Sequence, residues 1–163
     1  MIHNVLTEEE RIYILNFVNT KLESIHGSPG LQTKPNLHTF REMDFFISRI
    51  KQYIQGYKIY KCWANFSVGD YIFWHQHPKP VVKSLVYYLV NNNNYGTMFR
   101  LKRETEEDPV SNIKIVKCPQ NSIYIFDSNL DHSVPCHLKE NRISITMKSS
   151  NHIFLKIIHF EWL

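Results

Sequence analysis

A chain of 163 residues is long enough for one domain with a substantial core and too short for two domains of ordinary size. Its composition, 43% hydrophobic, 21% charged and 13% aromatic, excludes a disordered or fibrous chain. The net charge of +4 comes from scattered lysines and arginines without a run of like charges, so it hints at an anionic ligand but does not indicate nucleic-acid binding.

Two amphipathic helices are predicted in the first third of the chain. Thr7 followed by Glu10 is a capping-box pattern, and the apolar stripe behind it runs up to "HGSPG" (26–30). Thr39 and Glu42 repeat the capping pattern before a second stripe, which Gly56 ends. The first stripe is Ile12, Leu15, Val18, Leu22 and Ile25, and the second is Phe46, Ile50, Tyr53 and Ile54.

From Tyr57 onward, short β-branched and aromatic runs alternate with turn residues, which predicts strands and no further helix. Such an order indicates antiparallel sheets packed face to face or rolled into a barrel. We therefore expect a single domain over 1–163, with a helical brace in 1–56, a β core in 57–163 and a charged loop at 102–112 that covers or borders a cavity. The predicted strands are about 57–67, 70–76, 83–90, 96–102, 112–117, 122–127, 132–138, 142–149 and 152–160.

Cysteine usage favours a reducing compartment, and neither a signal peptide nor a membrane span is predicted. Three cysteines without a Cys-x-x-Cys pair predict reduced thiols at Cys62, Cys118 and Cys136. The start "MIHNVLTEEERIY" lacks a cationic region followed by an apolar stretch, so no signal peptide is predicted. No apolar run approaches the ~18 residues that would suggest a membrane span.

A pair of histidines ends the stretch "WANFSVGDYIFWHQHP" (63–78). On a strand, His75 and His77 point to one face, with Trp74 and Gln76 on the other. Two imidazoles so placed can hold one metal ion, although same-face histidines also occur as packing or surface residues.

A third histidine and an arginine follow in "SIYIFDSNLDHSVPCHLKENRISITMK" (122–148). His132 entering from a neighbouring strand would complete a three-ligand face that leaves the opposite side of the ion open for substrate. Arg142, ten residues later and across a turn, is expected on the adjacent strand. Its guanidinium could grip a carboxylate bidentately, or it could pair with an acidic residue of loop 102–112.

Together these stretches resemble a family of 2-oxoglutarate- and Fe(II)-dependent oxygenases, many of them encoded by marine phages and bacteria. The resemblance covers about residues 57–149. It implies a double-stranded β-helix, which is a jelly-roll barrel with a metal at its open mouth. The matching positions are Trp63-Ala-Asn65, Gly69, His75-x-His77-Pro78, Ser84 with Tyr87-Tyr88-Leu89, Phe126-x-Ser128, His132 with Val134-Pro135, and Arg142-Ile-Ser144.

The resemblance also implies roles for these residues and a reaction. Fe(II) would be held by His75, His77 and His132, and the far carboxylate of the cosubstrate 2-oxoglutarate by Arg142 with Ser144 beside it. The oxo acid would become succinate and CO2 while a substrate carbon is hydroxylated.

One position departs from the wider superfamily, which has an aspartate where this chain has His77. Three neutral imidazoles would leave the double positive charge of Fe(II) uncancelled. Alternatively, a carboxylate such as Asp131 could be the ligand, but on a strand it would face away from His132. Tyr71 lies on the same side as His75 and is predicted either to reach the oxo acid or to be a core tyrosine.

Several residues and functions stay open. Asn65 could hold a turn or touch the cosubstrate, and only one of Tyr87 and Tyr88 can point inward. The other histidines are expected at the surface or in packing: His3, His26, His38, His137, His152 and His159.

The alternative functions are a three-histidine dioxygenase of cupin type, a zinc hydrolase with a metal-bound hydroxide, and an inactive barrel that binds an anionic partner. The cupin reading lacks its expected glutamate in 80–84. We expect a small-molecule or peptide substrate, no membrane, and the cytoplasm of a bacterium or of a virus-infected host cell. Nucleic acid is not indicated, and a monomer and a homodimer are both open.

Overall fold

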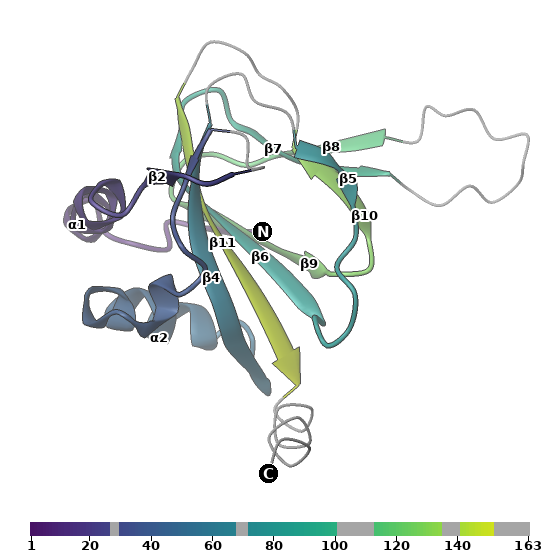
Figure 1. Ribbon diagram of the computed structural model, residues 1–163, viewed down its shortest axis with the longest axis horizontal. Helices are drawn as coiled ribbons and strands as arrows, with labels where there is room; N and C mark the ends of the chain where they lie inside the picture. The colour runs from purple at the N-terminus through teal and green to yellow at the C-terminus, as the bar shows by residue number, and fades with distance from the viewer. Residues whose placement is uncertain (27–29, 68–71, 101–112, 135–140, 152–163) are drawn as a thin grey trace, which may run out of the picture.

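Two antiparallel β-sheets form the fold, and the two α-helices lie outside the larger one (Figure 1). The computed structural model describes residues 1–26, 30–67, 72–100, 113–134 and 141–151. The helices are α1 (Glu8–Asn19) and α2 (Asp44–Lys51), with the 3-10 turns η1 (Leu37–Thr39) and η2 (Arg41–Met43) before α2. The strands are β1 (Ile2–His3), β2 (Glu23–Ser24), β3 (Leu31–Gln32), β4 (Tyr57–Ser67), β5 (Ile72–His75), β6 (Lys83–Asn91), β7 (Tyr95–Arg100), β8 (Ile113–Lys117), β9 (Ser122–Asp127), β10 (Asp131–Val134) and β11 (Arg142–Asn151).

The strand order is that of a double-stranded β-helix. The larger sheet runs β1-β9-β6-β11-β4-β3-β2, and the smaller one runs β5-β10-β7-β8. From β4 to β11 the chain passes back and forth between the sheets, with β7 and β8 forming an antiparallel pair inside the smaller one. The predicted mainly β jelly roll with two N-terminal helices is therefore confirmed.

Alternation along β11 gives the larger sheet two different faces. Ile143, Ile145 and Met147 belong to the core under the helices. Arg142, Ser144 and Thr146 line a pocket on the other face, between the sheets. Because successive side chains of a strand point to opposite faces, one strand supports the packing and presents the site.

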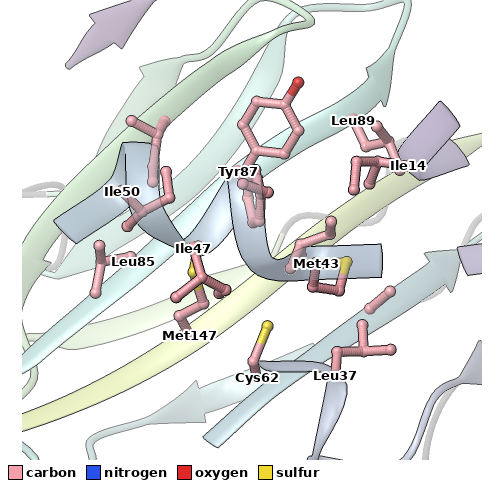
Figure 2. Close-up of a cluster of buried hydrophobic side chains, with 14 of the residues drawn as sticks. Ile14, Leu37, Met43, Ile47, Ile50, Cys62, Leu85, Tyr87, Leu89 and Met147 are labelled. Carbon is pink, nitrogen blue, oxygen red and sulfur yellow. The ribbon is translucent and has the colours of Figure 1, made fainter. Parts of the chain in front are cut away.

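The main hydrophobic core lies between the larger sheet and the helices. Figure 2 shows Ile14, Ile47 and Ile50 of the helices close to Tyr87 and neighbouring sheet residues, all of them buried. A smaller cluster fills part of the space between the sheets and contains Val86, Tyr88, Phe99, Val116, Cys118 and Phe126. Tyr87 and Tyr88 thus lie in different clusters, as their alternation predicts.

The first helix is shorter than predicted and turned relative to the predicted stripe. It ends at Asn19, and its buried residues are Arg11, Ile14 and Val18, whereas Ile12 is 44% exposed. The chain then forms β2, which pairs with β3 at the edge of the larger sheet. Leu22 and Ile25 therefore lie outside the helix, because sheet pairing overrides the helical pattern there.

The second capping box was wrong. Thr39 ends a 3-10 turn, and its hydroxyl donates to the Asn36 carbonyl at 2.8 Å. The helix begins five residues later at Asp44, with no side-chain cap. It ends at Lys51, so Tyr53, at 40% exposed, and the buried Ile54 follow it.

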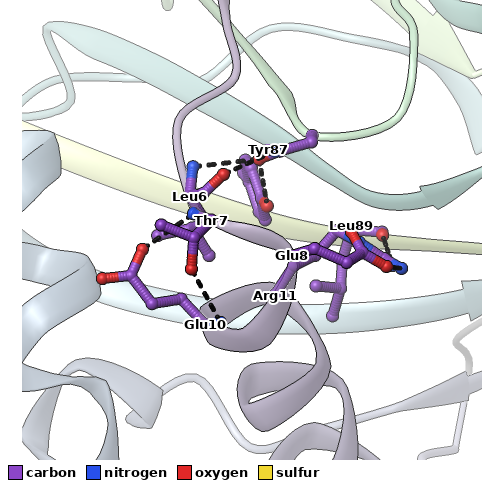
Figure 3. A network of polar contacts seen from close by, with 8 residues as sticks. Leu6, Thr7, Glu8, Glu10, Arg11, Tyr87 and Leu89 are labelled. Carbon is purple, nitrogen blue, oxygen red and sulfur yellow. Dashed lines mark hydrogen bonds and ion pairs between the residues drawn. The ribbon is translucent and has the colours of Figure 1, made fainter.

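The first capping box is confirmed, and the same turn is tied to the barrel (Figure 3). The Thr7 amide donates to Glu10 Oε2 at 2.8 Å, and the Glu10 amide donates to Thr7 Oγ1 at 3.2 Å. Arg11 Nη1 donates to the Leu89 carbonyl at 2.9 Å, while Tyr87 and the Leu6 amide both donate to Asn121 Oδ1. The start of α1 is therefore fixed on β6 and on the turn before β9.

Replacing Thr7 with alanine should lower the free energy of unfolding by about 1 kcal/mol, because an orphan amide of the first turn loses its acceptor. A shift of the urea midpoint measures this. Thr39→Ala is the matched control and should cost less than half as much, because Thr39 caps no α-helix. Equal losses would show that the capping box contributes nothing of its own.

Several predictions lie outside the described residues: Gly69, Tyr71, loop 102–112, Cys136 and strand 152–160. Of the described cysteines, Cys62 and Cys118 are free and buried, and burial raises the pKa of both thiols. No helix in the described part of the chain is long and apolar enough to cross a membrane.

Candidate metal centre

Three imidazoles meet inside the barrel, at the facing ends of β5 and β10. His75 and His132 are paired across these strands, and their ring centroids are 4.2 Å apart. The His77 ring lies 4.9 Å from each of the other two. One ring nitrogen from each residue falls within 4.8 Å of the others, which allows a single ion to contact all three.

His77 reaches this position from outside the strand. The predicted strand extended to 76, but β5 ends at His75. The His77 amide donates to the Ser128 carbonyl at 2.9 Å, which holds the backbone against the turn before β10. The same-face arrangement inferred from the spacing is therefore found, although a loop contact rather than strand pairing fixes its second member.

Asp131 points away from the three histidines. Its carboxylate lies 3.4 Å from Arg100 Nη1, and the Arg100 guanidinium lies 4.4 Å from the ring centroid of Trp74. Neither Asp131 nor Trp74 lines the pocket that contains the histidines. The alternative of Asp131 as a ligand thus finds no support in the geometry, as the alternation along β10 predicts.

Hydrogen bonds orient two of the rings. The Nδ1 of His75 lies 2.8 Å from the Phe73 carbonyl, and the Nδ1 of His132 lies 2.7 Å from the Leu130 carbonyl. A carbonyl can only accept, so Nδ1 carries the proton and Nε2 keeps its lone pair. This is how second-layer hydrogen bonds set the tautomer of a metal-binding histidine.

Burial keeps two of the imidazoles neutral. Loss of solvation lowers the pKa of His77 to about 3 and that of His132 to about 4, with nearby positive charges adding to the effect. A neutral imidazole is the form that binds a metal. His77 and His132 are therefore in the ligating state at neutral pH.

The metal-free protein should lose stability as the pH falls from about 6.5 toward 4. The folded state holds His77 and His132 unprotonated, whereas an unfolded histidine takes up a proton near pH 6.5, so acid favours unfolding. Above pH 6.5 this contribution is fully present. Urea midpoints at pH 7.5 and 5.0 measure the slope.

A His77→Gln, His132→Gln double variant should show a shallower slope over the same pH range. His26→Gln changes an exposed histidine and serves as the control. An unchanged slope in the double variant would contradict the assignment of the effect to the two buried rings.

Arg142 is a buried cation facing the same pocket. It is 9% exposed, its guanidinium lies 5.1 Å from the Tyr88 ring centroid, and its Nε has no hydrogen-bond partner among the described residues. Desolvation lowers its pKa, yet a guanidinium stays protonated in proteins. Within the described residues no carboxylate pairs with it. Such a group is costly to bury unless an anion binds it.

We had expected Arg142 on a strand adjacent to β10, and this expectation was wrong. Arg142 begins β11 in the larger sheet, whereas β10 belongs to the smaller one, so the arginine and the histidines face one another across the barrel. The reason is the double-stranded β-helix itself, in which the chain crosses from the smaller sheet to the larger one between β10 and β11. Ser144 lies two residues further along β11, on the same face, and is 5% exposed.

The pocket between the sheets has a volume of about 220 Å³ and contains both groups. Ile72, Val86, Phe126 and Val134 give it apolar walls, and none of its described lining residues is acidic. An apolar wall lowers the local dielectric, which strengthens any contact between Arg142 and an anion.

Asn65 does not hold a turn. It lines the pocket, and its side chain is hydrogen-bonded to three neighbours. It lies on β4, accepts from Trp63 Nε1 at 3.2 Å and donates to Thr146 Oγ1 at 3.2 Å. Gln32 also donates to it. Sequence reasoning missed Gln32, because β3 has two residues and no hydrophobic alternation reveals so short a strand.

Comparison with solved structures finds a similar fold in proteins solved with 2-oxoglutarate. HygX from Streptomyces hygroscopicus, solved with nickel, 2-oxoglutarate and hygromycin B, superposes with a TM-score of 0.72 at 9% identity over 93% of this chain and 82% of that chain. The collagen prolyl hydroxylase vCPH of Paramecium Bursaria Chlorella virus-1, solved with 2-oxoglutarate, superposes with a TM-score of 0.66 at 14% identity over 92% of this chain and 93% of that chain.

A prolyl hydroxylase from Trichoplax adhaerens, in complex with a peptide of hypoxia inducible factor, gives a TM-score of 0.66 at 15% identity over 96% of this chain and 84% of that chain. At the level of sequence, no family model and no curated protein matches. Because these identities are low, the likeness establishes the double-stranded β-helix fold and no more.

Proposed function

We propose that this protein is a 2-oxoglutarate- and Fe(II)-dependent oxygenase that hydroxylates a carbon of its substrate. One observation carries the proposal. Three imidazoles, two of them held neutral by burial, and a buried guanidinium without an anionic partner in the described residues face one pocket of a double-stranded β-helix.

His75, His77 and His132 would hold the metal. They offer three nitrogen ligands on one side and leave the other side of the ion to exchangeable ligands, as a catalytic site requires. Fe(II) with 2-oxoglutarate supplies the oxidation of a C–H bond by O2, with succinate and CO2 as co-products. The protein supplies the position of each partner.

Arg142 would bind the distal carboxylate of 2-oxoglutarate, and the Ser144 hydroxyl beside it can donate to the same group. The partnerless Nε and the apolar walls both favour a ligand anion at this end of the pocket. Tyr71 is proposed as a further contact to the oxo acid, on the sequence pattern alone.

The substrate we propose is a small molecule or a peptide. The structural neighbours include one solved with hygromycin B and one solved with a peptide. We also infer a single domain, residues 1–163, in which 1–56 braces the barrel, and activity in the cytoplasm of a bacterium or of a virus-infected cell.

Succinate formation tests the proposal. The purified protein is freed of metal, reloaded with Fe(II) and supplied with 2-oxoglutarate, ascorbate and O2, without added substrate. Slow uncoupled turnover is expected, and the same protein loaded with Zn(II) is the control. Stoichiometric zinc without turnover under iron would favour a hydrolase, while failure to bind any metal would favour a binding module.

A further inference from the structure

A lysine continues the pocket-facing series of β11. Arg142, Ser144 and Thr146 line the pocket, and Lys148 is the next residue of that face. Its Nζ lies 5.2 Å from the ring centroid of Trp63, which also lines the pocket. Lys148 therefore stands at one end of the site, next to an aromatic wall.

Exposure increases along this face of β11, from Arg142 toward Lys148. Arg142 and Ser144 are buried, whereas Lys148 is half-buried and its register partner on β4, Lys61, is exposed. Trp63, which the Lys148 ammonium approaches, lines the same pocket as the three histidines. Lys148 thus lies at the more exposed end of this face, which we call the mouth, and Arg142 lies at the buried end.

The positive charge at the mouth has no protein counterpart in the described residues. No carboxylate forms an ion pair with Lys148 or Lys61 among these residues, and none lines the described pocket. Burial and the positive charge of Lys61 both lower the pKa of Lys148. Two cations held together without an anion make a favourable position for an anionic ligand.

The proposed cofactors leave this charge unmatched. An Fe(II) ion held by three neutral imidazoles keeps its double positive charge, because no carboxylate ligand cancels part of it. The dianion of 2-oxoglutarate offsets the ion and Arg142 only in part, since its two charges face three. Lys148 and Lys61 remain for the molecule that approaches the mouth.

We propose that Lys148, supported by Lys61, is a specificity-determining residue that binds a negatively charged oxygen, of a carboxylate or a phosphate, on the substrate. This inference rests on the proposed function and names the substrate class of the same site. The competing reading is a structural one, in which the ammonium only covers the Trp63 ring.

Paramagnetic relaxation separates the two readings. The protein is loaded with Co(II) and saturated with 2-oxoglutarate, and the methyl protons of small probes are followed by NMR, with Zn(II)-loaded protein as the diamagnetic blank. Acetate and methyl phosphate are the anionic probes, and acetamide and trimethyl phosphate are their neutral counterparts. The better anion identifies a carboxylate or a phosphate site.

We expect at least one anion to be relaxed about tenfold more strongly than its neutral counterpart. Lys148→Met should remove this excess, and Lys148→Arg should retain it. Lys51→Met, which removes an exposed charge at the end of α2 behind the larger sheet, should leave it unchanged. Equal relaxation of anions and neutral probes, or an excess that survives Lys148→Met, would overturn the inference.

Co(II) absorption and 2-oxoglutarate titration are measured on each protein first. A wild-type protein that binds both metal and 2-oxoglutarate but shows no anion excess would sink this inference and leave the proposed function intact. A wild-type protein that binds neither would overturn both.

Discussion

Replacing His132 with alanine should abolish stoichiometric metal binding. The residue supplies one of three imidazoles within 4.8 Å of one another and is the most buried of them, at 5% exposed. The two imidazoles that remain would be too few ligands to hold the ion tightly. We expect affinity for Co(II) or Fe(II) to fall more than about 100-fold, since even losing a partner of a ligand costs 10–100-fold. Titration calorimetry under nitrogen measures it.

Two controls accompany the His132 variant. His26→Ala removes an exposed histidine and should bind metal as the wild type does. Circular dichroism of the metal-free proteins shows whether the barrel is intact, because His132 also contacts Phe126, with ring centroids 4.9 Å apart. A folded His132→Ala protein that still holds one equivalent of iron would mean that the third ligand has been assigned to the wrong residue.

Replacing Arg142 with alanine should weaken the binding of 2-oxoglutarate far more than the binding of iron. The guanidinium is buried at the end of the pocket away from Lys148, where its loss would leave the distal carboxylate without a cation. Breaking a buried charge pair costs about 3–5 kcal/mol, which is more than 100-fold in affinity. Binding of 2-oxoglutarate to Co(II)-loaded protein measures this loss.

A shortened ligand makes the Arg142 test specific. 2-Oxobutyrate keeps the oxo acid group that contacts the metal but lacks the distal carboxylate, so its affinity should change little in Arg142→Ala. Arg142→Lys keeps the charge but loses the planar fork, and we expect an intermediate loss for 2-oxoglutarate. Equal weakening of metal, 2-oxobutyrate and 2-oxoglutarate would indicate a folding role instead.

The local pattern of the sequence was sufficient to predict most strands of the barrel and the grouping of the three histidines. Spacing of two residues puts His75 and His77 on one side even though only His75 lies in the strand. The long strands β4, β6 and β11 were predicted to within about two residues, because β-branched or aromatic residues recur along each of them. Tyr71 and the boundaries of the domain stay predictions.

What the sequence did not reveal depends on contacts between distant segments. The sheet that contains Arg142 follows from the winding of the whole barrel, and no local pattern distinguishes a neighbouring strand from a facing one. The two-residue strands β1, β2 and β3 exist only through pairing, because β1 pairs with β9, β3 with β4, and β2 with β3. The helix starting at Thr7 was found from its cap, but its length was set by pairing at the sheet edge.

The two-faced strand β11 also constrains which changes in chain length the protein can accept. Its even-numbered side chains serve the pocket and its odd-numbered ones, Ile143, Ile145 and Met147, fill the core. Deleting or inserting one residue near Arg142 would exchange the two sets, placing a guanidinium under the helices and isoleucines beside the histidines. A change in chain length inside β11 should therefore disrupt both the core and the pocket, while single substitutions on the pocket face can alter the ligand without disturbing the scaffold.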